Sequence, residues 1–384
     1  MQKEKVFLVS SLHFLLDSYM GFFAIYIVIA KLDPMKAALI ASISAFVGNV
    51  LQPFMGYAAD RVRGKFPLFL GLILTPLSMS MLGITDKYVP LFFLVFFGHI
   101  GSSFFHPAGA NIASAAGIAR KDRSMSVFST IGTIGYALSQ PLFSAFTGAF
   151  GTSRSWLLMF HTIVLAVILF SLSKTRIHGP EQVMRLKDVG SILRQRLVPL
   201  LLLFFIMVFR MSFIVALDTF LAKTFEEWGF PRSIYSIASP VFMLSGAGGI
   251  LLSGHIAHRI RPWKLLFFSL TSFFPFFLGF LTAGRAGNLT LAFIFLGLCG
   301  FFIQGSYVSN IVMGHRVAPE MTSTISGILM GFAWASASFG PVLCAFSRDA
   351  LWFSGLASGL LVLSFFPLIA AFGAIALSKF TGNQ

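Results

Sequence analysis

The 384-residue sequence has little charge and very little cysteine. Asp and Glu number 13, and charged residues of both signs make up 11% of the chain, whereas a soluble protein needs about 25% to cover its surface. This excludes the two or three soluble domains that the length alone would favour. Cys299 and Cys344 both lie inside apolar runs, so a disulfide framework and a cysteine-based zinc site are excluded as well.

Nucleotide-binding elements are missing too. The sequence has no phosphate loop and no glycine-rich fingerprint after a strand, and these are the elements that hold ATP or a dinucleotide. It also has no nucleophile–base set typical of an enzyme. An ATP-driven pump is therefore disfavoured, no cofactor is expected, and an ion gradient is the expected energy source.

Apolar residues are abundant, at 57% of the chain, with Phe at 47 positions. Runs of roughly 20 apolar residues cross a bilayer as helices, and the first, from Val6 to Ala30, is too long for a signal peptide. We predict an all-α membrane protein with twelve transmembrane helices, and we expect the Phe excess to face lipid. The predicted spans are residues 6–30, 37–58, 66–84, 90–112, 125–150, 154–173, 197–221, 233–254, 263–283, 289–313, 322–346 and 351–376.

The net charge of +15 comes from basic residues in short clusters between these spans. Because they form no single basic stripe, nucleic acid is not an expected partner. If the N-terminus is cytoplasmic, 19 of the 28 Lys and Arg residues fall on that side and 8 on the other, with Arg210 inside a span. The positive-inside rule then predicts that both termini face the cytoplasm, in a multi-pass protein of the bacterial inner (plasma) membrane.

The longest polar segment, residues 174–196, divides the spans six and six. We therefore predict an N-terminal six-helix bundle over residues 1–173, a cytoplasmic linker over 174–196 and a C-terminal six-helix bundle over 197–384. We interpret the linker as a solvated tether, with its basic residues against anionic lipid headgroups.

The two halves share residues in one register, at an offset of about 200 positions. Two parallel six-helix repeats related by an axis along the membrane normal are the arrangement of major facilitator transporters. We therefore expect two pseudo-symmetric bundles in a monomer that rocks around a midplane site. The repeated residues are Gly56, Ala59, Arg61 and Arg63 with Gly254, Ala257, Arg259 and Arg261; Gly98, Gly101 and Asn111 with Gly297, Gly300 and Asn310; and Gly132 and Pro141 with Gly331 and Pro341.

The segment 56–65, where the second span leaves the membrane, resembles the signature loop of the major facilitator superfamily. It has a glycine followed four residues later by Asp-Arg and then a basic cluster. The resemblance implies a gating network that latches the cytoplasmic side in one state. Positive-inside anchoring is the alternative, and it explains the basic residues but neither the aspartate nor the glycine. The predicted gating residues are Gly56, Asp60, Arg61, Arg63, Lys65 and, in the second copy, Arg259.

Three segments resemble fosmidomycin-resistance-type efflux proteins: residues 13–17, 51–57 and 101–107. The Gly-Ser-Ser…Phe-His-Pro run of the third is the most specific. The resemblance implies efflux; it covers the N-terminal half, while the C-terminal half matches only the general fold. That group places a carboxylate directly after the His-Pro pair, and here the residue is Ala108, so we expect the coupling acid elsewhere.

Ionisable residues inside the spans are functional candidates, because charge in hydrocarbon is costly. His13 and Asp17 are four residues apart and share one helical face, while His99 and His106 are seven apart on the fourth helix, which adjoins the first in this fold. Since histidine titrates near physiological pH, we predict these four as proton-coupling residues, with hydrogen-bonded packing as the alternative. Their sequence spacing is not that of metal ligands, so no metal is expected.

Arg210, in the seventh span, lies at a depth similar to that of Asp17. We predict that the two line a central cavity from opposite halves, as a pair that a proton or the substrate breaks; a static ion pair is the alternative. Arg210 also points to an anionic or phosphonate-like substrate. Asp218, two turns further on, is predicted to be a cavity residue, with a gate at the outer end as the alternative.

Uncharged polar residues complete the predicted cavity. The fifth span loosely resembles the glycine-proline pattern of drug–proton antiporters, with Gln140 in place of the glycine before Pro141, whereas Gly340-Pro341 keeps the pair. A proline-kinked helix is the alternative. The cavity candidates are Gln140, Gln304 and Asn310, followed by Asn49, Gln52, Tyr307 and Trp334.

These features predict a secondary active transporter that exports a small organic compound or drug in exchange for protons by alternating access. Its expected partners are a small-molecule substrate, protons and membrane lipid. A proton-coupled importer of a small metabolite or organic anion shares every feature above. A transporter-like receptor without transport is a further alternative, which fits better with a large soluble appendage.

Overall fold

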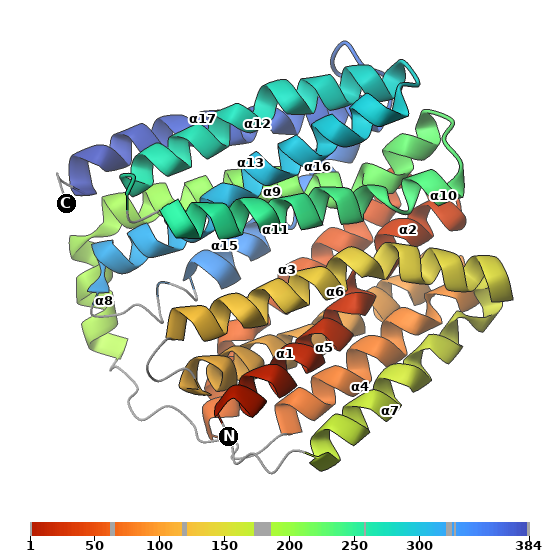
Figure 1. Cartoon of the computed structure of the whole chain (residues 1–384), viewed down its shortest axis with the longest axis horizontal. Helices are drawn as coiled ribbons and strands as arrows, with labels where there is room; N and C mark the ends of the chain where they lie inside the picture. The colour runs from red at the N-terminus through yellow and green to blue at the C-terminus, as the bar shows by residue number, and fades with distance from the viewer. Residues whose placement is uncertain are drawn as a thin grey trace. The chain divides into compact units, whose positions relative to one another are not determined.

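A computed structural model describes residues 2–61, 66–116, 121–172, 186–256, 259–319, 325 and 328–381. The described residues form helices and connecting turns, with no strand among them (Figure 1). The chain divides into two compact units, Met1–Glu181 and Gln182–Gln384.

The first unit begins with a helix that is interrupted once. Gly21 separates α1 from α2, and a Cβ at this glycine would overlap Ser139 of the fifth predicted span. The elements of this unit are α1 (Gln2–Met20), α2 (Phe22–Ile29), α3 (Pro34–Arg61), α4 (Phe66–Ser80), the 3₁₀ turn η1 (Met81–Ile84), α5 (Tyr88–Ala116), α6 (Lys121–Phe150), the 3₁₀ turn η2 (Thr152–Leu157) and α7 (Leu158–Leu172).

The second unit begins with α8, which occupies the C-terminal part of the predicted linker. Its eleventh predicted span is broken at Ser338 and Phe339, directly before Gly340-Pro341. The elements are α8 (Leu186–Gln195), α9 (Leu197–Glu227), α10 (Arg232–Tyr235), α11 (Ala238–Ile256), α12 (Pro262–Arg285), α13 (Leu289–Val317), the π-helical turn η4 (Ile328–Phe332), α15 (Ala333–Ala337), α16 (Gly340–Phe346) and α17 (Leu356–Thr381).

Ten helical segments among the described residues are long and apolar enough to cross a membrane. They coincide with ten of the twelve predicted spans. The prediction 125–150 falls on α6, and the prediction 154–173 falls on η2 and α7, with residue 173 outside the described residues. Helix α6 is long enough but rich in Ser, Thr and Gly, and α7 is described over only 15 residues. Both predicted segments are helical. They differ from the ten membrane-length segments in composition, for α6, or in the length that is described, for α7.

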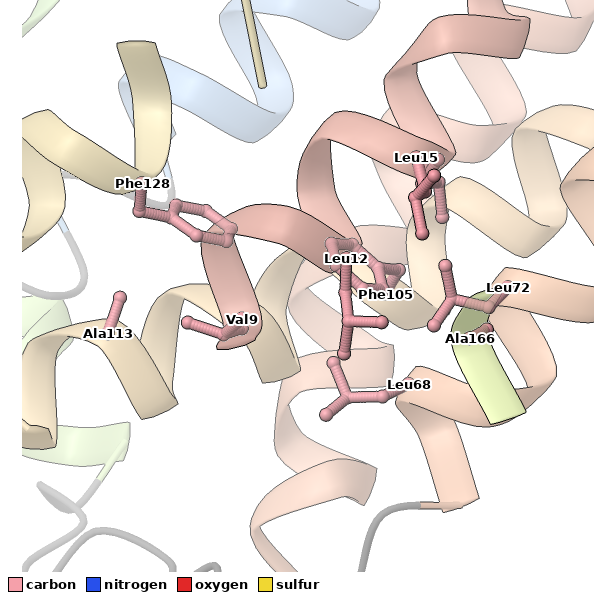
Figure 2. Close-up of a cluster of buried hydrophobic side chains, with 10 residues drawn as sticks. Val9, Leu12, Leu15, Leu68, Leu72, Phe105, Ala113, Phe128 and Ala166 are labelled. Atoms are coloured by element: carbon pink, nitrogen blue, oxygen red, sulfur yellow. The ribbon is translucent and has the colours of Figure 1, made fainter. Parts of the chain in front are cut away.

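The apolar segment from Glu4 to Ile29, made of α1 and α2, is more enclosed than α3. Of its most apolar stretch 78% is buried, against 28% for α3, and it packs against α4, α5 and α6 (Figure 1). Val9, Leu12 and Leu15 lie three residues apart along α1, in one buried cluster with Leu68 and Phe105 (Figure 2). Since lipid tails are as apolar as leucine, van der Waals contact and close helix approach hold such a core together.

Close helix approach depends on glycine in both units. A Cβ at Gly135 of α6 would overlap the backbone of Phe14 on α1, and a Cβ at Gly340 of α16 would overlap the backbone of Ser212 on α9. In each unit a glycine of the fifth predicted span therefore allows close contact with the first. The α3–α5 and α11–α13 pairs also correspond.

Many of the Phe side chains are buried inside the protein, and only some are exposed. Of the twelve largest fully buried side chains, ten are Phe, so the prediction that Phe faces lipid was wrong for these positions. In the second unit, Phe213 lies 5.1 and 4.9 Å from the ring centres of Phe273 and Phe277. Offset and edge-on aromatic contacts of this kind fill the core between α9 and α12.

Candidate functional site

A three-residue cluster of two histidines and one aspartate lies in the first unit. His13 and Asp17 occupy one face of α1, and His106 reaches them from α5. Asp17 contacts both histidines: its Oδ2 is 3.0 Å from His13 Nε2, and its Oδ1 is 3.3 Å from His106 Nε2. The predicted grouping of these three residues therefore matches their positions in the structure.

The second ring nitrogen of His13 shows what its contact with Asp17 requires. His13 Nδ1 lies 2.9 Å from the carbonyl oxygen of Phe128 on α6. Because a carbonyl oxygen only accepts, Nδ1 carries the hydrogen, and a neutral imidazole then has a bare lone pair at Nε2. That lone pair faces a carboxylate oxygen of Asp17 at 3.0 Å. The contact is attractive only with one further proton, either on the imidazole or on the carboxyl group.

The neighbours of His106 are compatible with either tautomer of its ring. Its Nδ1 lies 2.9 Å from the hydroxyl oxygen of Ser102 and 3.0 Å from the Ser102 carbonyl oxygen. The hydroxyl can donate to Nδ1, which leaves Nε2–H to donate to Asp17, or the carbonyl can accept from Nδ1–H. The His106 side chain is 27% exposed, against 13% for Asp17 and 7% for His13, so exposure falls along the cluster from His106 to His13.

Tight packing holds the His13 ring in place. The ring stacks on Phe128 with centroids 4.0 Å apart and meets the His106 ring edge-on at 5.0 Å. A Cβ at Gly132 of α6 would overlap the His13 ring. Glycine at this position therefore lets the imidazole lie between α1 and α6.

The ligand-type atoms of His13, Asp17 and His106 also lie within 4.8 Å of one another, close enough to be considered for a metal ion. The sequence spacing gave no sign of this, because His106 comes from another helix. Both nitrogen–oxygen contacts already have hydrogen-bond length, which fits shared protons. The absence of a metal stays a prediction.

Other predicted residues of the first unit lie apart from this cluster. His99 is half-buried on α5 beside Gly48 of α3, and among the described residues it makes no hydrogen bond or ion pair with the cluster. Seven residues separate His99 from His106, which is about 10.5 Å along a helix. Gln140 is fully buried on α6, and neither polar atom of its side-chain amide has a hydrogen-bond partner among the described residues.

The predicted gating loop is described only in part. Gly56, Asp60 and Arg61 belong to the end of α3, but their side chains lie outside the described residues, as do Arg63 and Lys65 altogether. Arg259 follows the end of α11 and is exposed. The latch therefore stays a prediction.

Arg210 occupies the middle of α9 and is 1% exposed. Its Nη2 donates to the sulfur atoms of Met207, at 2.9 Å, and Met211, at 3.2 Å. Its guanidinium carbon lies 5.1 Å from the centre of the Tyr307 ring on α13. Nε has no hydrogen-bond partner among the described residues. The predicted pair with Asp17 stays a prediction; in its own unit Asp17 already has two partners.

The remaining predicted residues of the second unit join its helices. Asp218 is buried and accepts a hydrogen bond of 2.6 Å from Ser239. Gln304 donates to the carbonyl oxygen of Phe242 at 3.5 Å, and Asn310 donates to that of Leu203 at 3.4 Å. The Asn310 side-chain oxygen has no partner among the described residues.

Several partners of these residues were missing from the sequence reasoning. The Phe128 carbonyl group carries no sequence signal, because any residue has one. Ser102 had a signal: it lies four residues before His106, so the two share a helical face. Met207 and Met211 are similarly placed, three residues before Arg210 and one after it.

The chain matches the family model described as Major Facilitator Superfamily over residues 6–341. It is 24% identical to the MFS-type transporter YfnC of Bacillus subtilis, over 87% of this chain and 82% of that protein. It is 21% identical to the fosmidomycin resistance protein of Escherichia coli, over 82% of this chain and 78% of that protein.

Two solved structures share the fold. A bacterial homologue of the human lysosomal transporter Spinster, in an inward-facing and occupied conformation, aligns with a TM-score of 0.77 and 15% identity, over 97% of this chain and 96% of that chain. A mutant of the nucleoside transporter NupG aligns with a TM-score of 0.73 and 15% identity, over 98% and 100%. With the family match over most of its length, the chain belongs to the major facilitator superfamily and is a secondary transporter with a multi-pass membrane fold.

Proposed function

We propose that this transporter exports a small organic compound in exchange for protons, with His13, Asp17 and His106 as the proton-binding group. The observation that carries the proposal is the His13–Asp17 contact. With Nδ1–H committed to the Phe128 carbonyl oxygen at 2.9 Å, the 3.0 Å contact to Asp17 needs one proton beyond a neutral histidine and an ionised aspartate. In this proposal the His13–Asp17 contact carries the exchanged proton.

Loss of that proton changes how three helices attract one another. His13 joins α1 to α6 through Phe128, and Asp17 joins α1 to α5 through His106. Without the proton, a lone pair and a carboxylate oxygen repel each other across the His13–Asp17 contact. The deprotonated cluster therefore favours a different packing of α1 against α5 and α6. A proton that prefers one of two packings shifts the equilibrium between them, which is the requirement for coupling.

The direction of transport is inferred from sequence resemblance and from the placement of basic residues. The chain resembles a protein named for fosmidomycin resistance at 21% identity, which favours export. The distribution of Lys and Arg favours cytoplasmic termini and a place in the bacterial plasma membrane. The loop from Gly56 to Lys65 would then lie on the cytoplasmic side, where it acts as the latch between states.

The experiment begins with a panel of toxic organic compounds in a bacterial host that lacks its own efflux pumps. Compounds to which the chain confers resistance are then followed in inside-out vesicles with an imposed pH gradient. Export by exchange predicts that a vesicle interior more acidic than the outside drives the compound inward. Accumulation with the opposite gradient would indicate the importer, and transport that ignores the gradient would contradict the proton coupling.

A further inference from the structure

We propose that the transported compound is an organic anion whose acidic group binds Arg210, with Tyr307 and Trp334 beside it. This inference rests on the proposed function, because it names the substrate class of the same transporter. It is argued from the second unit alone, where Arg210 lies on α9, Tyr307 on α13 and Trp334 on α15.

The guanidinium group of Arg210 lacks the partners that a buried charge requires. A guanidinium has five N–H donors, and thioether sulfur is a weak acceptor. Here one nitrogen, Nη2, donates to two such sulfurs, while Nε has no partner among the described residues. A buried cation is normally paired with an anion or held by strong acceptors. Arg210 therefore keeps donor capacity for which the described residues of its own unit supply no acceptor.

The acidic residues of this unit whose side chains are described have partners other than Arg210. None of those with described side chains forms an ion pair with Arg210. Their contacts are a hydrogen bond from Ser239 to Asp218, an ion pair of Lys223 with Glu226, an ion pair of Arg348 with Glu227, and an ion pair of Arg348 with Asp349. The counter-ion expected for Arg210 is thus not a described side chain of the second unit, and a bound anion would fill this role.

The surroundings of Arg210 suggest what accompanies the acidic group. The Tyr307 ring lies beneath the guanidinium at 5.1 Å, and its centroid is 6.4 Å from the Trp334 ring, in an edge-on arrangement. The Trp334 indole N–H is buried and has no acceptor among the described residues. An oxyanion accepts from both guanidinium and indole N–H groups, and a flat apolar body packs on aromatic rings. We therefore expect aromatic carboxylates to bind.

A purely structural role for Arg210 and a ligand-binding role predict different effects of its replacement on stability. If the contacts with Met207, Met211 and Tyr307 were present only to hold helices together, replacing Arg210 would lower the melting temperature. If Arg210 is an unpaired cation kept for a ligand, an uncharged side chain of similar length removes an uncompensated charge. Such replacements of buried ionic groups are often neutral or stabilising.

The test uses the purified full-length protein in detergent micelles, without any gradient. Unfolding is followed with a thiol-reactive dye, because Cys299 and Cys344 are both buried and free. The probes are benzoate and 1-naphthoate, each compared with its neutral amide at equal ionic strength. Arg210→Gln and Arg210→Met remove the charge, and Arg210→Lys keeps it. The matched control is Arg285→Gln, since Arg285 is an exposed arginine of the same unit.

We expect both acids, and neither amide, to raise the melting temperature of the native protein and of the Arg285→Gln protein. Arg210→Gln should weaken acid binding by about 10- to 100-fold, the ratio that corresponds to charge-assisted hydrogen bonds, and Arg210→Lys should weaken it less. Without ligand, Arg210→Met should melt at or above the native temperature.

Several results would overturn the inference: equal effects of acids and amides, no effect of either acid, an acid effect that survives Arg210→Gln, or a clear loss of ligand-free stability in Arg210→Met. The acid–amide comparison needs only native protein, so it holds even if a variant fails to fold. Because binding is measured without a gradient, acid binding with gradient-independent transport would contradict the proposed proton coupling and leave this inference standing.

Discussion

Replacing Asp17 by Asn should separate proton coupling from folding. Asn has the shape of Asp but cannot take up or release a proton. Its amide nitrogen can donate to the bare Nε2 of His13, and its carbonyl oxygen can accept from Nε2–H of His106, whose Nδ1 then accepts from Ser102. Every contact of the cluster is therefore satisfied in Asp17→Asn without the additional proton.

The size of the effect follows from the proton count. Exchanging one proton per cycle, a transporter converts one pH unit into about 1.4 kcal/mol, which supports a concentration ratio of roughly tenfold at zero membrane potential. In Asp17→Asn the ratio should fall to about one, because the cycle no longer binds the proton. Since each hydrogen bond is replaced by another, the free energy of unfolding should change by no more than about 1 kcal/mol.

The assay is gradient-driven accumulation of an identified substrate in vesicles, alongside counterflow of labelled against unlabelled substrate at equal pH. Asp17→Asn should lose the first and keep the second. Asp33→Asn is the matched control, because Asp33 is exposed and caps α3 through a 2.9 Å hydrogen bond from the Lys36 backbone nitrogen, a bond that Asn also accepts. Gradient-driven accumulation by Asp17→Asn at the native level would refute the proton assignment.

Three further substitutions test the packing around these residues. Gly132→Ala should displace the His13 ring and reduce gradient-driven transport more strongly than it lowers the melting temperature; equal, proportionate losses would contradict a specific effect on the cluster. Gly340→Ala should force α16 away from the Ser212 backbone and destabilise the protein by about 1–3 kcal/mol, as overpacking does, measured by thermal unfolding in micelles. Tyr19→Phe removes a hydroxyl that bonds two oxygens of α7, at 2.5 and 2.6 Å. It should cost about 1–2 kcal/mol without changing the pH dependence of transport.

The helices and most of the cluster of His13, Asp17 and His106 could be predicted from the sequence. Apolar runs of bilayer length fix the spans, and the four-residue spacing of His13 and Asp17 fixes their common face. His106 joined them because the family fold brings the first and fourth spans together. His99 shared the face of His106 but not its depth, since a spacing of seven residues preserves direction along a helix and still separates side chains by two turns.

Features that depend on the backbone or on exact helix approach could not be predicted. The need for a proton between His13 and Asp17 follows from the hydrogen bond of His13 to the Phe128 carbonyl oxygen. No residue type marks which carbonyl group will face a histidine. Arg210 was recognised as an unusual charge in a span, but its neighbours depend on how α9 turns toward α13. The sequence suggested Asp17 as its counter-ion, whereas the structure gives Asp17 two histidine partners in its own unit.

The cluster of His13, Asp17 and His106 in the first unit and Arg210 in the second lie at similar places in the duplicated scaffold. In each unit a glycine brings the fifth span close to the first: Gly135 contacts Phe14 in one unit, and Gly340 contacts Ser212 in the other. At the offset of about 200 positions that relates the two halves, the polar contact between the first and fourth spans falls within about one turn in both units. It carries His13 with His106 in one and Arg210 with Tyr307 in the other. Because the close glycine contacts set the helix spacing in each unit, the side chains between the first and fourth spans can differ without changing the scaffold. One unit can then hold a group that gains and loses a proton, while the other holds a charge that arginine keeps at every physiological pH.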